Sequence, residues 1–342
     1  MSIKKFDPKA LNAWIDRLIA KEKVIGVQAD GERFAFGPLD RAEDLRLDYD
    51  VTKLPPKKYF LPQKETLMTF DKGGAFKGVI ESEPFVLLGV HPYDMVAINQ
   101  MDAIFSRDNG DPNYLTRRQS AVIVACDPQN ASHHTFAGSM GTATVDEGFD
   151  VLLSKVGEVY LADARTEKGE ALLAEAAEAV EPAETDLARR EQLWEDNSKL
   201  LSKHDLDCSP SEIPALLEQS YNSPRWEEKA ERCFSCGSCN LVCPTCYCFD
   251  VQDDVNWDIA SGKRERSWDG CLLSEFAIVA GNHNFRPNRA DRYRHRFYRK
   301  GKYLMDRMGQ IACVGCGRCV TACVPDIANP VTIYNQLLED QQ

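Results

Sequence analysis

The chain has 342 residues, of which 43% are hydrophobic and 27% charged, and its formal net charge is -12. This length exceeds one typical hydrophobic core and predicts two domains with a connecting segment. The acidic balance argues against a general surface for nucleic acid or anionic lipid, because phosphate groups would be repelled. No run approaches the roughly 18 apolar residues of a membrane span, so we expect a cytoplasmic protein without a membrane segment.

Residues 1–165 have the pattern of an α/β domain. Asp7 and Pro8 are the predicted N-cap and first residue of a helix that continues to about residue 19. The expected strands are "VIGVQA", "RFAF", "PFVLLGV", "AVIVAC" and "GEVYLADA", and "YDMVAINQMDAIF" is the expected helix between two of them. The long apolar runs favour strands that are covered on both faces. We expect this domain to serve as a docking platform.

The next segment, residues 166–222, is predicted to be a helical acidic linker. Its first part, residues 166–200, contains ten acidic and four basic side chains, and Pro182 divides it. Ser223 and Pro224 then form a plausible helix start. From there to residue 342 we expect a mostly α-helical domain, with one helix over "CLLSEFAIVAG" and a longer one carrying Tyr293, Phe297 and Leu304.

Two cysteine runs dominate this C-terminal region. Both have the spacing C-x2-C-x2-C-x3-C: Cys233, Cys236, Cys239 and Cys243 in the first, and Cys313, Cys316, Cys319 and Cys323 in the second. Three thiolates two residues apart can wrap a loop around one 4Fe-4S cube, whereas the fourth follows one helical turn later and need not face the same cube. The spacing therefore predicts two 4Fe-4S clusters in a dicluster ferredoxin-like domain with a helical insertion.

In paired motifs of this kind, the fourth cysteine of each run serves the other cluster. We expect Cys233, Cys236 and Cys239 to share one cluster with Cys323, and Cys313, Cys316 and Cys319 to share the other with Cys243. A proline directly follows Cys243 but is displaced to Pro325 after Cys323. Structural zinc is the alternative, although two four-cysteine runs supply more ligands than zinc uses.

Five cysteines lie outside the runs: Cys126, Cys208, Cys246, Cys248 and Cys271. A buried free thiol is the ordinary state of each. Cys246 and Cys248 directly follow the first run, however, and a chain reversal could bring Cys271 near them, so these three are candidates for a third metal site.

The basic stretch "HNFRPNRADRYRHRFYRKGKY" carries eight Arg and Lys residues among aromatic ones. Such a composition can serve RNA binding, or it can form a solvated helix face. It can also compensate the negative charge of a four-thiolate cluster.

Several segments resemble one known family: "CPTCYCFD", "HNFRPNRADRYRHRFY", "CVGCGRC", "LPPKKYFLPQKETLMTF" at 54–70 and "LLGVHPYDMVAI" at 87–98. They are similar to the iron-sulfur beta subunit of cytoplasmic sulfhydrogenases and to the corresponding iron-sulfur subunit of anaerobic sulfite reductase. The same module occurs in flavin oxidoreductases linked to heterodisulfide reductase. One departure is at "HHTFAGSMGT", where Thr135 and Ala137 stand in a region in which relatives often have cysteines.

The resemblance implies a non-catalytic subunit of a multisubunit oxidoreductase complex in anaerobic metabolism. Such a subunit carries two 4Fe-4S clusters and relays electrons between a partner with FAD and a 2Fe-2S cluster, which reacts with NAD(P)H, and a hydrogenase, sulfite reductase or heterodisulfide-reductase-type subunit. No Ser/His/Asp set or nucleotide fingerprint predicts a catalytic residue. Two alternatives are a reductase with a third metal centre at Cys246, Cys248 and Cys271, and a zinc-stabilised RNA or protein adaptor.

Overall fold

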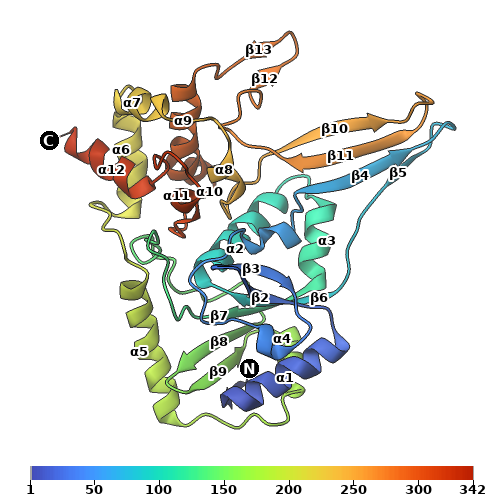
Figure 1. Cartoon of the computed structure of the whole chain (residues 1–342), viewed down its shortest axis with the longest axis vertical. Coiled ribbons are helices and arrows are strands. Elements are labelled where there is room, and N and C mark those ends of the chain that lie inside the picture. The colour runs from blue at the N-terminus through green and yellow to red at the C-terminus, as the bar shows by residue number, and fades with distance from the viewer. Residues whose placement is uncertain (1, 342) are drawn as a thin grey trace.

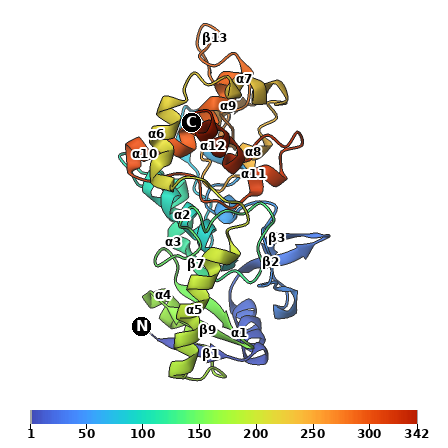
Figure 2. The same ribbon diagram turned by 90° about the vertical axis from the view of Figure 1, so that its left-hand side faces the viewer.

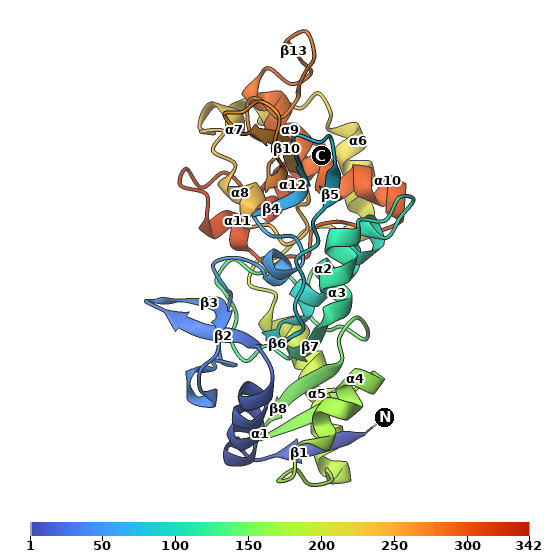
Figure 3. The ribbon, with the colours of Figure 1, turned by 90° about the vertical axis from the view of Figure 1, so that its right-hand side faces the viewer.

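The computed structural model describes residues 2–341. A seven-stranded sheet with its helices occupies one end of an elongated molecule, and the helical C-terminal region occupies the other (Figure 2 and Figure 3). A second, narrower sheet projects sideways from the junction (Figure 1). None of the helices within residues 2–341 combines the length and the apolar character needed to cross a lipid bilayer.

The seven-stranded sheet has the order β1-β9-β8-β7-β6-β2-β3. Its strands are β1 (Ile3–Phe6), β2 (Val24–Asp30), β3 (Arg33–Pro38), β6 (Phe85–Val90), β7 (Ala121–Cys126), β8 (Val151–Val156) and β9 (Val159–Ala164). The four central strands β2, β6, β7 and β8 run parallel, and the outer pairings are antiparallel. Every residue of β6 is buried, as its continuous apolar sequence predicts.

Five helices accompany this sheet: α1 (Pro8–Lys21), α2 (Pro92–Phe105), α3 (Pro112–Ser120), α4 (Glu167–Ala174) and α5 (Glu184–Leu200). Asp7 caps α1 by accepting a hydrogen bond from the Ala10 amide at 2.7 Å. The fully buried Trp14 donates its Nε1 hydrogen to the Leu172 carbonyl at 3.1 Å, which ties α1 to α4. Helices α4 and α5 contact β9 and β8, so the acidic segment packs on the sheet.

The C-terminal region is mostly helical, as expected. It contains α6 (Ile213–Gln219), α7 (Arg225–Glu231), α8 (Ser238–Leu241), α9 (Arg289–Tyr298), α10 (Leu304–Met308), α11 (Arg318–Thr321) and α12 (Pro330–Glu339). The π-helical turn η4 (Arg299–Tyr303) joins α9 to α10 without a break. Gly301 in this turn is required by close packing, because a Cβ there would lie 2.6 Å from side-chain carbons of Ile213 and Leu217.

The helix expected over residues 271–281 is absent, and that prediction was wrong. The segment turns repeatedly and enters β12 (Ile278–Val279), which pairs with β13 (His283–Asn284). Its apolar residues do not share one face: Leu272 is buried in the C-terminal core, whereas Ile278 and Val279 are exposed. The helical insertion therefore also contains strands.

The projecting sheet is shared by both halves of the chain and was not predicted. Its order is β10-β11-β4-β5, with β4 (Lys64–Phe70) and β5 (Phe76–Gly78) from the N-terminal half and β10 (Phe249–Val255) and β11 (Gly262–Trp268) from between the cysteine runs. Strand β11 pairs with β4 in antiparallel register, with one irregularity between Arg264 and Glu265. Segments about two hundred residues apart thus form one sheet.

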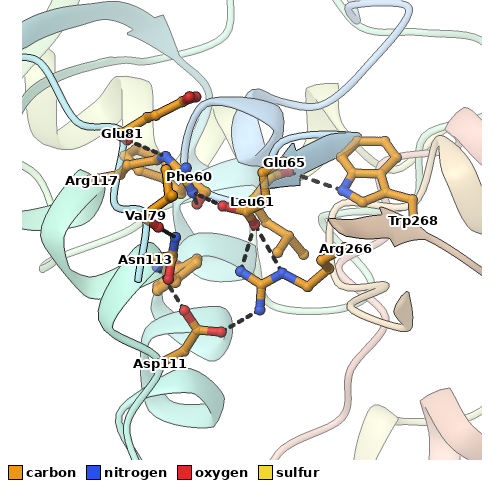
Figure 4. Close-up of polar contacts among 11 residues, drawn as sticks. Phe60, Leu61, Glu65, Val79, Glu81, Asp111, Asn113, Arg117, Arg266 and Trp268 are labelled. Atoms are coloured by element: carbon orange, nitrogen blue, oxygen red, sulfur yellow. Dashed lines mark hydrogen bonds and ion pairs between the residues drawn. The ribbon is translucent and has the colours of Figure 1, made fainter. Parts of the chain in front are cut away.

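Buried charges join this sheet to α3 (Figure 4). Glu65 on β4 accepts from Arg266 Nε and Nη2 on β11 at 2.9 and 2.6 Å, and it lies 2.6 Å from Arg117 Nη1. Arg266 also pairs with Asp111 at the start of α3. Both side chains of the Glu65–Arg266 pair are at most 3% exposed, so each charge depends on its partners.

We expect Glu65→Gln to destabilise the protein by about 3–5 kcal/mol, because it removes the carboxylate that Arg117 and Arg266 share and leaves Arg266 with Asp111 alone. Denaturation of the anaerobically prepared protein, followed by circular dichroism, measures the loss. The matched control is Glu83→Gln, which removes an exposed ion pair with Lys23 and should cost at most about 1 kcal/mol. Equal stability of the two variants would contradict the role of Glu65.

Candidate functional site

The two cysteine runs adopt the same local backbone. Gly237 (φ 73°) and Gly317 (φ 76°) both take the left-handed conformation directly before α8 and α11. Two residues earlier, Ser235 (φ 52°) and Gly315 (φ 66°) are also left-handed. Helices α8 and α11 contact one another, so the runs lie side by side although about seventy residues separate them.

The first cavity is lined by Cys233, Cys236 and Cys239 of the first run and by Cys323 of the second. The Ser235 amide donates to Cys233 Sγ, and the Ile327 amide donates to Cys323 Sγ, each at 3.4 Å. Cys236 is exposed, and the neighbouring Phe234 and Val324 are 66% and 85% exposed. This cavity therefore lies at the surface of the C-terminal region.

The second cavity is lined by Cys313, Cys316 and Cys319 of the second run and by Cys243 of the first. Phe136, Pro330 and Tyr334 also contribute to its wall. Each cavity thus combines three cysteines of one run with the fourth of the other. This grouping fits the expected ligand exchange, and metal ligation at these eight residues stays a prediction.

Burial favours the protonated form of these thiols even though cations lie nearby. It raises the pKa of Cys313 and of Cys316 to about 12. A metal must therefore displace a strongly held proton to bind sulfur here, and nearby cations favour that loss.

Two buried cations reach this region from the helix that α9 begins. Arg296 lines the second cavity. Burial lowers the pKa of its guanidinium, but the negative charges of Cys239 and Cys319, one cysteine from each cavity, outweigh burial and raise the pKa above its ordinary value. Lys300 Nζ donates to Thr245 Oγ1 at 2.7 Å, and its pKa is likewise raised against the effect of burial by Cys243. Within residues 2–341, neither cation forms an ion pair with a carboxylate, so the cysteines become their charge partners only when they are deprotonated.

A loop of the N-terminal half closes over the second run. The Phe136 amide and the Thr135 hydroxyl both donate to the Gly315 carbonyl, at 2.8 and 3.1 Å. A Cβ on Gly315 would lie 2.6 Å from the Cα of Ala137, so only glycine permits this approach. Thr135 and Ala137 therefore pack directly against the second run.

A buried ion pair adds a second link between the halves. Arg318, next to Cys319 on α11, donates to both carboxylate oxygens of Asp94 on α2 at 2.6 Å. Its Nε also donates to the Thr52 carbonyl at 2.9 Å. Sequence reasoning assigned no role to this pair, although both residues lie in the segments "CVGCGRC" and "HPYDM" that carry the resemblance.

The remaining cysteines divide into two sets. Cys246, Cys248 and Cys271 lie near the base of β10 and β11, where Asn240 contacts the sulfurs of Cys246 and Cys271. Cys126 is buried in β7, and Cys208 precedes α6. In the part of the chain that is described, no three His, Cys, Asp or Glu side chains converge closely enough to hold a single metal ion.

Comparison with known proteins agrees with this geometry. A family model described as "4Fe-4S dicluster domain" matches residues 232–327. The chain is also 33% identical over 314 residues to "Sulfhydrogenase 2 subunit beta" of Pyrococcus furiosus, with 91% of each chain covered. The chain belongs to the sulfhydrogenase beta-subunit family.

Membership of this family confirms the predicted resemblance, and the α/β region followed by a dicluster domain confirms the predicted fold class. The chain is an iron-sulfur subunit of the electron-transfer type. The number of clusters, their individual ligands and the partner subunits stay predictions.

A buried histidine beside the Asp94–Arg318 pair provides a pH test of this junction. The His91 ring stacks on Tyr49 with centroids 3.9 Å apart, and its Nδ1 lies 2.7 Å from the Tyr93 hydroxyl. Burial, with a smaller effect of Arg318, lowers the pKa of His91 well below its ordinary value of 6.5. The folded protein therefore keeps this ring neutral at pH values where the unfolded chain protonates it.

The free energy of unfolding should fall as the pH decreases through 6.5 and continue to fall toward the lower pKa of the folded state. We expect His91→Phe, which retains the ring stack, to weaken this acid dependence. Denaturation midpoints of both proteins at pH 7.5, 6.5 and 5.5 measure it. If the denaturation midpoints of the two proteins changed with pH in the same way, the acid dependence could not be assigned to His91.

Proposed function

We propose that this chain is an electron relay with two 4Fe-4S clusters. Cys233, Cys236, Cys239 and Cys323 would hold one, and Cys313, Cys316, Cys319 and Cys243 the other. The crossed grouping of these cysteines around two cavities supports the proposal most directly. When bound, such clusters supply one-electron transfer without a change of substrate bonds.

The chain's own residues suit this role. Backbone amides of Ser235 and Ile327 point at sulfur and would stabilise its negative charge. Arg296 lies close enough to Cys239 and Cys319, one from each cavity, for their charges to raise its pKa, so it would act on both clusters at once. Arg289 donates to the Cys233 carbonyl at 3.2 Å and so orients the first loop.

The positions of the cavities suggest a direction for the relay. The first cavity is lined by the exposed Phe234, and the exposed Val324 directly follows its Cys323; exposed apolar side chains of this kind are typical of a surface that contacts another protein. The second lies deeper, beneath the Thr135 loop. A redox partner would therefore exchange electrons first with the cluster on Cys233, Cys236 and Cys239.

The name of the Pyrococcus furiosus relative describes one subunit of a sulfhydrogenase. By analogy, our chain would connect an NAD(P)H-linked flavoprotein subunit, with FAD and 2Fe-2S, to a hydrogenase, sulfite reductase or heterodisulfide-reductase-type subunit. Co-purification of the native complex, followed by identification of its chains and flavin analysis, tests this assignment. Isolation of a complex without a flavoprotein would contradict it.

The second candidate function is a reductase acting at a third metal centre on Cys246, Cys248 and Cys271. The contact of Asn240 with two of these sulfurs favours a metal group there. Reduction of sulfite or another acceptor by the isolated chain, with an artificial electron donor, would favour this function over the relay.

Cys323→Ala tests the ligand exchange. It should abolish the cluster on Cys233, Cys236 and Cys239, with a loss of about half of the motif-bound iron. Cys319→Ala is the matched change and should abolish the other cluster. Electron paramagnetic resonance and iron analysis distinguish the two, and loss of the same signal in both variants would contradict the exchange.

Arg296→Gln should lower the reduction potentials of both clusters, because the reduced cluster carries more negative charge than the oxidised one. A shift on the order of 50–100 mV corresponds to about 1–2 kcal/mol for one electron. Arg294→Gln, on the same helix but paired with Asp291, is the control and should shift neither potential. Redox titration monitored by electron paramagnetic resonance measures the effect, and equal potentials in the two variants would contradict it.

A further inference from the structure

Three cysteines outside the two cavities are brought together by the hairpin of β10 and β11. Cys246 and Cys248 precede β10, and Cys271 follows β11. The hairpin pairs Phe249 with Trp268, and the Asp269 amide donates to the Cys248 carbonyl at 3.0 Å. Although Cys248 and Cys271 are 23 positions apart in the sequence, strand pairing therefore returns the chain to the same place.

One buried amide links two of these sulfurs. Asn240 on α8 is only 2% exposed, and its Nδ2 donates to Cys246 Sγ at 3.6 Å and to Cys271 Sγ at 3.4 Å. Its Oδ1 is buried and has no hydrogen-bond partner within residues 2–341. An unsatisfied polar atom in the interior costs free energy, so its retention next to sulfur points to a ligand.

Positive charge is also concentrated beside these thiols. Lys57, on the 3-10 turn η2 (Pro56–Tyr59), is 3% exposed, and its Nζ donates to the Cys246 carbonyl at 2.6 Å. The same ammonium lies 4.2 Å from the centre of the Trp268 ring. It forms no ion pair with a carboxylate in the described part of the chain. A buried cation requires a nearby anion, and thiolates are the candidates present.

This environment repeats the one around the two motif cavities. There, too, buried and half-buried thiols face cations that lack carboxylate partners among residues 2–341, and amide hydrogens point at sulfur. As in those cavities, the sulfurs do not converge on a point that suits a single metal ion. Cysteine sulfurs with amide donors and compensating cations beside them are a suitable setting for an iron-sulfur cluster.

We propose that Cys246, Cys248 and Cys271 hold a third iron-sulfur cluster, with Asn240 beside it and Lys57 compensating its charge. Three thiolates leave one corner of a 4Fe-4S cube for a non-cysteine ligand, or they complete a 3Fe-4S cluster. The site lies at the base of the projecting sheet, where the two halves of the chain meet. This third cluster goes beyond the two-cluster relay, and its Cys246 lies in hydrogen-bond contact with Cys243 of the second cavity.

Iron and acid-labile sulfide analysis of the anaerobically purified full chain tests the proposal. The wild type should contain three or four iron atoms beyond the roughly eight of two 4Fe-4S clusters. Cys271→Ser should lose this surplus and one electron paramagnetic resonance signal while keeping the other two signals. Cys208 is partly exposed and lies outside all three groups of cysteines, so Cys208→Ser should lose neither iron nor any signal.

Two further variants make the result independent of a folding defect. Cys323→Ala should reduce the iron bound by the two cysteine runs but retain the electron paramagnetic resonance signal of the third cluster. This result separates failure of the relay from failure of this proposal. Asn240→Asp should shift only the third signal to a lower reduction potential, because it adds negative charge beside that cluster. About eight iron atoms in the wild type with no change in Cys271→Ser would overturn the proposal, and so would zinc without surplus iron.

Discussion

The C-terminal half of this protein depends on balancing charge in its interior. Its cysteines are mostly buried or half-buried, and burial alone would keep several of them as neutral thiols. The same region contains two buried cations, Arg296 and Lys300, that have no carboxylate partner among residues 2–341. Both lie on one nearly continuous helix from Arg289 to Met308. Without negative charge on sulfur, these cations would themselves be unfavourable. Sulfur and cation therefore stabilise each other, and a bound cluster completes the balance.

The N-terminal half is built into this arrangement. Asp94 neutralises Arg318 beside the second cysteine run, and the Thr135 loop satisfies the Gly315 carbonyl. Glu65 neutralises Arg266 in the projecting sheet in the same way. Because each of these partners lies across the junction, the orientation of the α/β region relative to the cysteine runs is determined by buried polar contacts. The predicted docking role of the α/β region would rely on this fixed orientation.

Features that depend on local chemistry could be predicted from the sequence. Strands β6 and β7 follow from uninterrupted apolar runs, the start of α1 follows from Asp7 and Pro8, and the two cysteine runs follow from their spacing. The strands of the projecting sheet could not be predicted in this way, since β11 reads "GKRERSW" and its partner β4 lies about two hundred residues earlier. Arg318 and Asp94 look like ordinary surface residues until the fold removes both from water. The apolar spacing of residues 271–281 imitates a helix, but pairing of Ile278 with Asn284 and burial of Leu272 require a different path.

The shared sheet also has a consequence for the order in which the chain can fold. Strand β4 is complete at residue 70, but its partner β11 ends only at residue 268. At ordinary rates of translation, the ribosome needs on the order of 10–40 seconds to make the intervening residues. During that time one edge of β4 is unpaired and open to contact with other nascent chains. The newborn protein must therefore be shielded, or remain locally unfolded around β4, until most of its length has been synthesised.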